Sequence, residues 1–214
     1  MFVRERMSAE PVTISASASI TEALRTLRQH QVRRLPVLDE NGALIGIVSE
    51  KDLLYASPSP ATSLSIYEMH DMLSRLQVTE LMTADPVTVT PDTLLEEAAL
   101  IMADSKFGGL PVVKDGELVG IITETDIFIV FLELLGARQK GLRVTLRIPE
   151  RMGEMARITT AIARLGGNIL ALGSFLGDDP TTGIVTVKVV DVPADQLASA
   201  MHDLGLEILD SRET

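Results

Sequence analysis

The sequence predicts a mixed α/β (α+β) protein, in which two copies of one α/β unit are followed by a βαββαβ unit. Two stretches of the first two thirds repeat each other at an offset of 75 residues, with Pro86 matching Pro11. The hydrophobic pattern changes after Gly136, where strict alternation replaces the repeat. The 214 residues are 46% hydrophobic and 23% charged, which is typical of one or two globular domains.

The repeat is carried by three separated segments of each copy. Residues 7–14 (MSAEPVTI) match 82–89 (MTADPVTV), and an LPV triplet at 35–37 returns at 110–112. Residues 44–53 (LIGIVSEKDL) match 118–127 (LVGIITETDI) with one residue lost in the preceding turn, where a deletion costs least. We therefore assign copy one to residues 7–54, a linker to 55–80 and copy two to 81–138.

Each copy is predicted to contain an extended piece, a helix, a two-stranded hairpin and a second helix. In copy one these are residues 12–14, 21–30, 35–38 with 44–48 around an Asn41-Gly42 turn, and a helix from Ser49. In copy two the helix covers 94–103, the turn is Asp115-Gly116 and the second helix starts at Thr123. Neither copy can bury both of its faces, so we expect the copies to pack together.

The linker and the last third have their own patterns. Apolar residues at helical spacing predict a linker helix at 65–76, within which His70 is expected to be structural. The last third, residues 141–212, alternates between strand and helix periods in the order βαββαβ, which is the ferredoxin-like arrangement. Its elements are expected at 142–148, 153–165, 169–176, 184–190, 194–204 and 206–209.

Composition excludes several kinds of site. The chain has no cysteine, which excludes disulfides, thiolate nucleophiles, iron–sulfur clusters and cysteine-bound zinc. Its three histidines, His30, His70 and His202, are far apart, so we expect no histidine-based metal site. A net charge of −11 without a basic stripe disfavours nucleic acid as a partner. No apolar run approaches the roughly 20 residues of a membrane helix, so a cytoplasmic protein without membrane partners is expected.

Two spaced motifs carry a family resemblance. Gly46-x-x-Ser49-x-x-Asp52 and its equivalent Gly120-x-x-Thr123-x-x-Asp126, each after an LPV strand, resemble the CBS motif, and the tandem pair resembles a Bateman module. The resemblance implies a cleft between the repeats that binds adenine nucleotides or S-adenosylmethionine.

The motif residues fit that chemistry. A carboxylate accepts two hydrogen bonds from vicinal ribose hydroxyls, which makes Asp52 and Asp126 the ribose candidates. Ser49 and Thr123 begin helices, where backbone N–H groups favour a phosphate. The alternative is a plain helix-capping box, and the two roles are compatible.

The copies differ just before the Leu-Pro pair, where copy one reads QVRR (31–34) and copy two reads KFGG (106–109). Because the resemblance implies that basic residues here reach phosphate, we expect the Asp52 site to prefer a phosphorylated ligand through Arg33 and Arg34. The Asp126 site should be weaker for phosphate, with Lys106 its nearest base. The alternative is that both arginines are only solvated. The complete set of nucleotide-site candidates is Thr13, Arg33, Arg34, Pro36, Ser49, Asp52, Val87, Thr88, Lys106, Pro111, Thr123 and Asp126.

The last third resembles an ACT domain through residues 148–158 (IPERMGEMARI) and 165–169 (LGGNI). That family usually has Pro-Gly where this chain has Met152-Gly153, and the retained glycine is compatible with a tight turn. The resemblance implies that two segments face a partner subunit and trap a small ligand such as an amino acid. Their residues are Met152, Gly153, Glu154, Asn168 and Ile169. The alternative is a domain that only dimerises, with Asn168 a turn residue.

The order CBS–CBS–ACT resembles the acetoin-utilisation accessory proteins of bacteria. The predicted function is a non-enzymatic regulatory sensor, a cytoplasmic homodimer or tetramer that binds AMP, ADP, ATP or S-adenosylmethionine and acts on an unidentified protein target. It requires no cofactor and no metal. The first alternative is a structural dimerisation module with empty clefts. The second is a small hydrolase, which the sequence disfavours because no motif pairs a nucleophile with a base.

Overall fold

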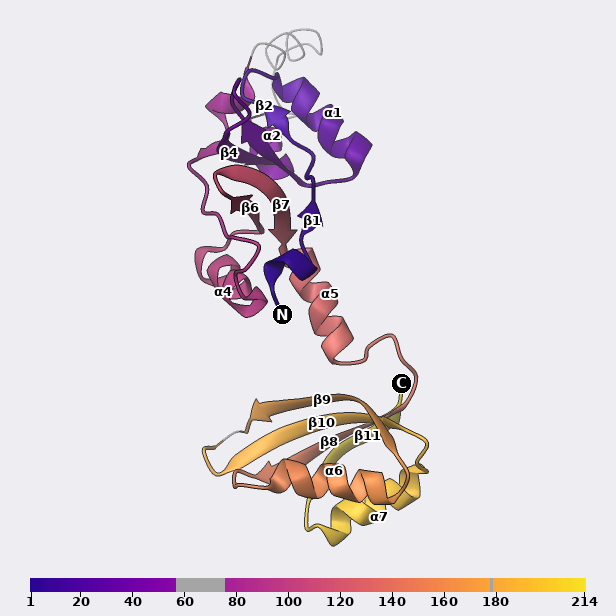
Figure 1. The fold of residues 1–214 in the computed structure, drawn as a ribbon. Coiled ribbons are helices and arrows are strands. Elements are labelled where there is room, and N and C mark those ends of the chain that lie inside the picture. The colour runs from indigo at the N-terminus through magenta and orange to yellow at the C-terminus, as the bar shows by residue number, and fades with distance from the viewer. Residues whose placement is uncertain (57–75, 178) are drawn as a thin grey trace. The chain divides into compact units, whose positions relative to one another are not determined.

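A computed structural model describes residues 1–56, 76–177 and 179–214 of the chain (Figure 1). Residue contacts divide the chain into unit 1, Met1–Ile127, and unit 2, Phe128–Thr214. The predicted linker helix at 65–76 and His70 lie outside the described residues, except for Leu76.

Copy one of unit 1 follows the predicted order. Helix α1 (Ile20–His30) begins at Ser19, whose side chain accepts a hydrogen bond from the Glu22 N–H at 3.2 Å. It is amphipathic and buries Ile20, Ala23 and Leu27 against the sheet. The remaining elements are η1 (Val3–Glu5), β1 (Ser8–Ala9), β2 (Ile14–Ser15), β3 (Arg34–Leu38), β4 (Leu44–Ser49) and α2 (Glu50–Tyr55).

Copy two repeats these elements. They are η2 (Val78–Glu80), β5 (Thr83–Ala84), α4 (Leu95–Ser105), β6 (Gly109–Lys114), β7 (Glu117–Thr123) and α5 (Glu124–Leu134). Helices α1 and α4 end alike, at Gln31 and Lys106, which both have left-handed backbone angles. Asp115 and Gly116 also have positive φ, as the tight hairpin turn requires.

The two copies exchange their leading strands. β1 of copy one pairs antiparallel with β7 of copy two, and β5 of copy two pairs antiparallel with β4 of copy one. The sheets therefore have the orders β2-β3-β4-β5 and β1-β7-β6. The expected packing of two copies is realised with shared sheets, which the assigned boundaries of 7–54 and 81–138 did not anticipate.

The segments before these strands are exchanged in the same way. The Val3 N–H donates to Thr93 O at 2.9 Å, and the Val78 N–H donates to Ala18 O at 2.9 Å. Val3 and Val78 are completely buried. The end of the assigned linker, from residue 76, is thus built into copy one.

Unit 2 has the predicted βαββαβ order. Its elements are β8 (Leu142–Pro149), α6 (Glu154–Arg164), β9 (Asn168–Leu176), β10 (Thr182–Val190), α7 (Ala194–Asp203) and β11 (Glu207–Glu213). The antiparallel sheet has the order β11-β8-β10-β9, and α6 and α7 cover one face (Figure 1). The last strand is longer than the expected 206–209.

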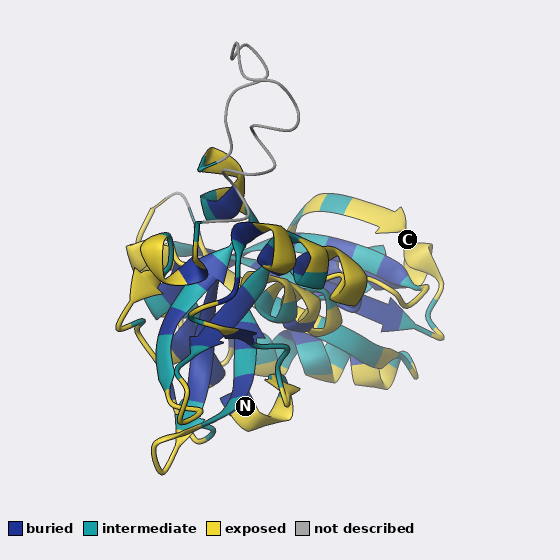
Figure 2. Cartoon of the chain, turned by 90° about the horizontal axis from the view of Figure 1, so that it is seen from above, coloured by how far each residue is buried: buried dark blue, intermediate teal, exposed yellow. Residues whose placement is uncertain are grey.

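The core of unit 2 lies between this sheet and its helices. Alternate residues of β8 and β10 are buried, and they contact Ile158 and Ile162 of α6 and Leu197 and Met201 of α7. Figure 2 shows the buried residues gathered along the strands and the helix faces that meet them. This core is entirely aliphatic apart from methionine, as a chain with 3% aromatic residues requires.

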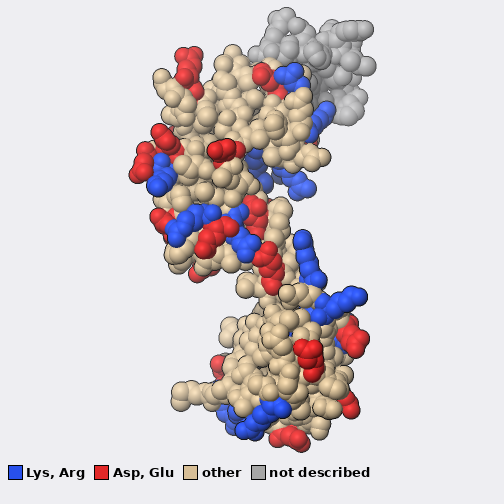
Figure 3. Space-filling view, turned by 45° about the vertical axis from the view of Figure 1, so that its right-hand side comes forward, with Lys and Arg blue, Asp and Glu red and all other residues tan. Residues whose placement is uncertain are grey.

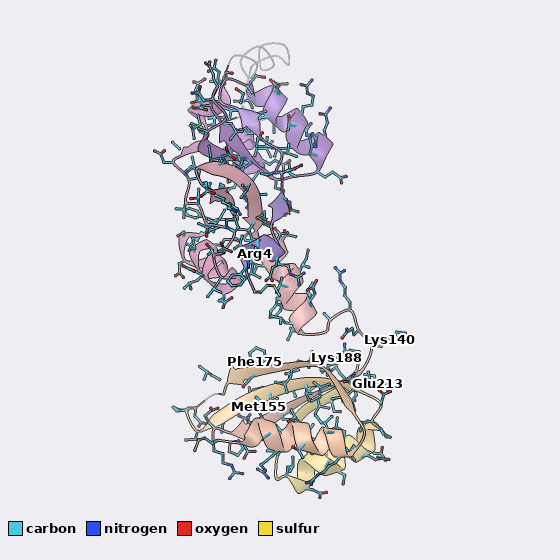
Figure 4. The ribbon with its side chains drawn as sticks, viewed as in Figure 1. Arg4, Lys140, Met155, Phe175, Lys188 and Glu213 are labelled. Atoms are coloured by element: carbon cyan, nitrogen blue, oxygen red, sulfur yellow. The ribbon has the colours of Figure 1, made fainter. Side chains whose placement is uncertain are left out.

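Lys188 is a buried cation on the opposite face of that sheet, and is labelled in Figure 4. Its Nζ donates to Gly136 O at 3.0 Å. Gly136 has positive φ directly after α5, and its carbonyl lies where a helix C-terminus favours a positive charge. The contact fixes the chain entering β8 to the sheet.

Glu154 is the buried carboxylate of unit 2. Its side chain is 2% exposed and accepts hydrogen bonds from Arg157 Nη1 at 2.8 and 2.9 Å and from Arg151 Nε. Arg157 also donates to Leu204 O at 2.9 Å, at the end of α7. The hydrogen bond from Arg151 is the main cause that lowers the pKa of Glu154 below its ordinary value, against the opposing effect of burial. The network joins the start of α6 to the end of α7.

Replacing this carboxylate tests the network. We expect Glu154→Gln to lower the free energy of unfolding by about 1–3 kcal/mol at pH 7, because two arginines lose a charged acceptor. Since the folded-state pKa is lowered, the contribution is complete above the unfolded-state pKa of about 4.3 and is lost as pH falls through the folded-state pKa. Urea denaturation followed by circular dichroism measures both effects. The exposed Glu150→Gln is the matched control, and equal losses in the two variants would contradict the role of Glu154.

Candidate functional site

Two cavities in unit 1 are lined by residues of both copies. The first, beside Asp52, has a volume of about 460 Å³, and the second, beside Asp126, has about 430 Å³. Both are within the range of small-molecule sites. The strand exchange creates them, because each motif strand, β4 or β7, pairs with the leading strand of the other copy.

The Asp52 cavity is lined mainly by the motif of copy one and the leading and KFGG segments of copy two. Its lining residues are Arg33, Arg34, Ile47, Ser49, Glu50, Lys51, Asp52, Thr83, Pro86, Val87, Lys106, Phe107, Gly108, Gly109, Leu110, Pro111 and Glu124. Four of these are basic and three are acidic. The lining therefore has a small excess of positive charge, although the net charge of the chain is −11. This excess favours an anionic ligand.

The Asp126 cavity has the reciprocal composition. Its lining residues are Ser8, Ala9, Glu10, Pro11, Val12, Gln31, Val32, Arg33, Arg34, Ile121, Thr123, Thr125 and Asp126. Here two arginines face two carboxylates, so this cavity has no cationic excess. On the face shown in Figure 3, Lys and Arg of unit 1 lie among Asp and Glu and form no continuous basic stripe.

Asp52 and Ser49 form a capping box at the start of α2. Asp52 Oδ2 accepts hydrogen bonds from the Ser49 N–H at 2.9 Å and from Ser49 Oγ at 2.6 Å. Ser49 Oγ in turn accepts from the Asp52 N–H at 3.3 Å. The capping interpretation of this motif is therefore confirmed.

Asp126 is held in the same way at the start of α5. Its Oδ2 accepts from the Thr123 N–H at 2.8 Å and from Thr123 Oγ1 at 2.7 Å. Within the described residues, neither motif carboxylate forms a hydrogen bond through Oδ1. The cap thus orients each half-buried carboxylate while leaving one oxygen for a ligand.

The structure brings together most of the predicted nucleotide-site residues. Those at the Asp52 cavity are Arg33, Arg34, Ser49, Asp52, Val87, Lys106 and Pro111, and those at the Asp126 cavity are Arg33, Arg34, Thr123 and Asp126. Thr13, Pro36 and Thr88 line neither cavity.

The assignment of Lys106 to the Asp126 site is wrong. Lys106 lines the Asp52 cavity, because the exchange brings the KFGG segment of copy two to the motif of copy one. Arg33 and Arg34 line both cavities rather than the Asp52 cavity alone.

Sequence reasoning missed the leading segments. Residues 8–12 line the Asp126 cavity, and Thr83, Pro86 and Val87 line the Asp52 cavity. Only Val87 was among the candidates. The available signal was the repeat itself, since MSAEP and MTADP occupy equivalent positions in the two copies. Glu10 and Asp85 there share a positive φ, which is uncommon outside glycine.

The candidates in unit 2 do not meet within one chain. Met152 and Gly153 follow the end of β8, where Pro149 is opposite Thr182, whereas Asn168 is opposite Val190 near the other end of the sheet. Met152 is fully exposed, and the carboxylate of Glu154 is occupied by two arginines. A site built from both segments would need a second chain.

Residues 1–56, 76–177 and 179–214 contain no group of three metal-ligating side chains. None of the helices described is long and apolar enough to cross a membrane.

Comparisons with known proteins agree with this geometry. Residues 3–59 and 78–133 match the CBS domain family. A protein assigned to acetoin utilization (AcuB) from Vibrio cholerae is 31% identical, with a TM-score of 0.53 over 64% of this chain and 95% of that chain. CBSX2 of Arabidopsis thaliana, solved in complex with AMP, is 34% identical, with a TM-score of 0.52 over 62% and 97%. The CBS domain pair of protein MJ0100, solved with 5′-methylthioadenosine and S-adenosyl-L-methionine, is 28% identical, with a TM-score of 0.52 over 65% and 98%.

The capping boxes give a prediction without any ligand. We expect Ser49→Ala to lower the free energy of unfolding by about 1 kcal/mol, because both Asp52 and the start of α2 lose a partner. Thr123→Ala should act similarly on α5. Chemical denaturation measures the loss, with Ser105→Ala at the exposed end of α4 as control. Unchanged stability in both motif variants would show that the caps do not form in solution.

Proposed function

Because the chain belongs to the CBS-domain family, we propose that unit 1 is a regulatory module that binds an adenosine-containing ligand in the cavities beside Asp52 and Asp126. The observation that carries the proposal is the pair of capped carboxylates, each facing a cavity with one unoccupied oxygen. An oxygen with two lone pairs accepts hydrogen bonds from both hydroxyls of a ribose.

The rest of the ligand is supported by the cavity walls. In the Asp52 cavity, Arg33, Arg34 and Lys106 supply cations for phosphate or for a carboxylate, and Arg does so with two parallel hydrogen bonds. Ile47, Val87 and Pro111 supply apolar surface for a base. The ligands of CBSX2 and MJ0100, AMP and S-adenosyl-L-methionine, contain the adenosine that such a site recognises.

The regulation follows from the position of the cavities. Each is lined by both copies, so a ligand that prefers one arrangement of the copies shifts the module toward it. The output is contact with a protein target in the cytoplasm, and the chain has no catalytic role in this proposal. The alternative of a small hydrolase is less well supported, because the Ser49 and Thr123 hydroxyls beside the motif carboxylates are engaged in helix caps.

We further propose that unit 2 is an ACT domain that pairs with a second copy of the chain through β9. Within the described residues β9 is an edge strand, hydrogen-bonded only to β10. It exposes Leu172, Phe175 and Leu176, and Phe175 projects from the sheet in Figure 4. An exposed apolar edge favours pairing with another strand. Such pairing is compatible with an amino-acid site completed by the Met152 and Asn168 segments of two chains.

Ligand binding is tested by a thermal-shift screen followed by calorimetry. The ligands are adenosine, AMP, ADP, ATP and S-adenosylmethionine. A ligand at about a hundred times its Kd should stabilise the fold by roughly 2.7 kcal/mol. We expect Asp52→Ala and Asp126→Ala each to abolish one binding event, because the ribose loses its acceptor.

Two controls separate binding from stability. The same shifts are measured relative to each ligand-free variant, since both substitutions also weaken a helix cap. Asp104→Ala, on the exposed end of α4, should bind like the wild type. Absence of any shift with all five ligands would favour the module with empty clefts.

Self-association is tested by light scattering coupled to size-exclusion chromatography. We expect the full chain to be at least dimeric and Phe175→Glu to reduce the dimer, because like charges meet across the paired edge. Leu209→Glu, on the opposite edge strand β11, is the matched control and should not change the mass. A monomeric wild type, or equal effects of both variants, would contradict pairing through β9.

A further inference from the structure

Arg34 lies at the boundary of the two cavities. It belongs to copy one and directly precedes the LPV strand, yet it lines both the Asp52 and the Asp126 cavity, as does Arg33. Arg34 is half-buried, whereas Arg33 is exposed. Of the two, Arg34 is therefore the cation with the more restricted surroundings.

The space for Arg34 comes from copy two. The residues equivalent to Arg33 and Arg34 are Gly108 and Gly109, so copy two sends no cation toward the boundary from these positions. The Arg34 guanidinium lies directly against Gly108, where the Cβ of any other residue would overlap it. Copy one thus supplies the arginine side chain, and the glycine of copy two leaves the space that its guanidinium occupies.

No carboxylate of the described residues forms an ion pair with Arg34. Its guanidinium is therefore available to an anion, and both cavities are within its reach. We propose that Arg34 is shared between the two cavities, so that a phosphate bound in one withdraws it from the other. This inference rests on the proposed function and adds to it a negative coupling specific to phosphorylated ligands.

The size of the coupling follows from the contact that is shared. A hydrogen bond to a charged group contributes enough that its loss weakens binding on the order of tenfold or more. Because coupling between sites is reciprocal, the order in which the cavities fill does not change its size. Adenosine, which has no phosphate, does not compete for Arg34 and should show only the coupling that the arrangement of the copies produces.

Repulsion between two bound phosphates would also give negative coupling, and Arg34 distinguishes the two causes. If the shared cation is the cause, Arg34→Gln removes the guanidinium for which the two phosphates compete, so the negative coupling decreases. If repulsion is the cause, removing a cation between the phosphates reduces screening and the coupling stays or increases.

Calorimetry of the full chain measures the coupling directly. Asp52→Ala and Asp126→Ala each leave only one cavity able to bind the ligand. Titrating the two variants therefore gives the affinity of AMP and of adenosine for each cavity alone. In the wild type, we expect the second AMP to bind about tenfold or more weakly than it binds the same cavity alone. For adenosine the two values should differ less than they do for AMP, because no phosphate competes for Arg34.

Two further variants complete the test. Arg34→Gln should bring the AMP ratio close to that of adenosine, whereas Arg28→Gln, an exposed arginine of α1, should leave it unchanged. Gly108→Ala in the Asp126→Ala background should weaken AMP more than adenosine in the Asp52 cavity, because the new methyl group displaces the guanidinium.

The outcomes separate this inference from the proposed function. Equal coupling for AMP and adenosine, or coupling that persists in Arg34→Gln, would overturn the sharing of Arg34 while leaving adenosine binding intact. Failure of both AMP and adenosine to bind would overturn the proposed function itself, and this inference with it.

Discussion

The exchange of leading strands between the two copies is the constraint on which the rest of unit 1 depends. β1 completes the sheet of copy two, and β5 completes the sheet of copy one, so neither copy has a full sheet alone. Val3 and Val78, just before these strands, are buried in the copy to which they do not belong. The same exchange places residues 8–12 in the Asp126 cavity and Thr83, Pro86 and Val87 in the Asp52 cavity, each beside the motif carboxylate of the opposite copy. The strand pairing that completes each sheet therefore also forms the cavities.

In each copy the repeated motif serves structure and candidate site with one carboxylate. In both copies the carboxylate Oδ2 caps a helix, and this capping fixes the direction of Oδ1. A side chain held by its own helix start loses little conformational freedom when a ligand binds, which favours affinity. The cap and the proposed ribose contact are two consequences of one geometry, and the compatibility expected from the sequence has a physical basis.

The sequence predicted the local structure well because local structure depends on nearby residues. Ser49 and Thr123 indicated the starts of their helices, the Asn41-Gly42 and Asp115-Gly116 turns indicated the hairpins, and strict alternation in 142–148 identified β8. Pairing between distant segments was beyond these signals. Two-residue strands such as β1 and β5 carry no periodicity, so the exchange went unseen, and Lys106 was assigned to the wrong cavity.

The two copies share the motif aspartate but differ in the segment before the LPV strand, and this difference bears on the proposed function. The motif repeats the carboxylate, so both cavities are lined by an equivalent aspartate. The segment before the LPV strand does not repeat, and it gives copy one two arginines where copy two has two glycines. Arginines in both copies would place like charges face to face at the boundary, where they would repel each other. Glycines in one copy remove that conflict, and Arg33 and Arg34 of copy one line both cavities. If Arg34 is shared as proposed, the response of unit 1 depends on the charge of the ligand as well as on its adenosine.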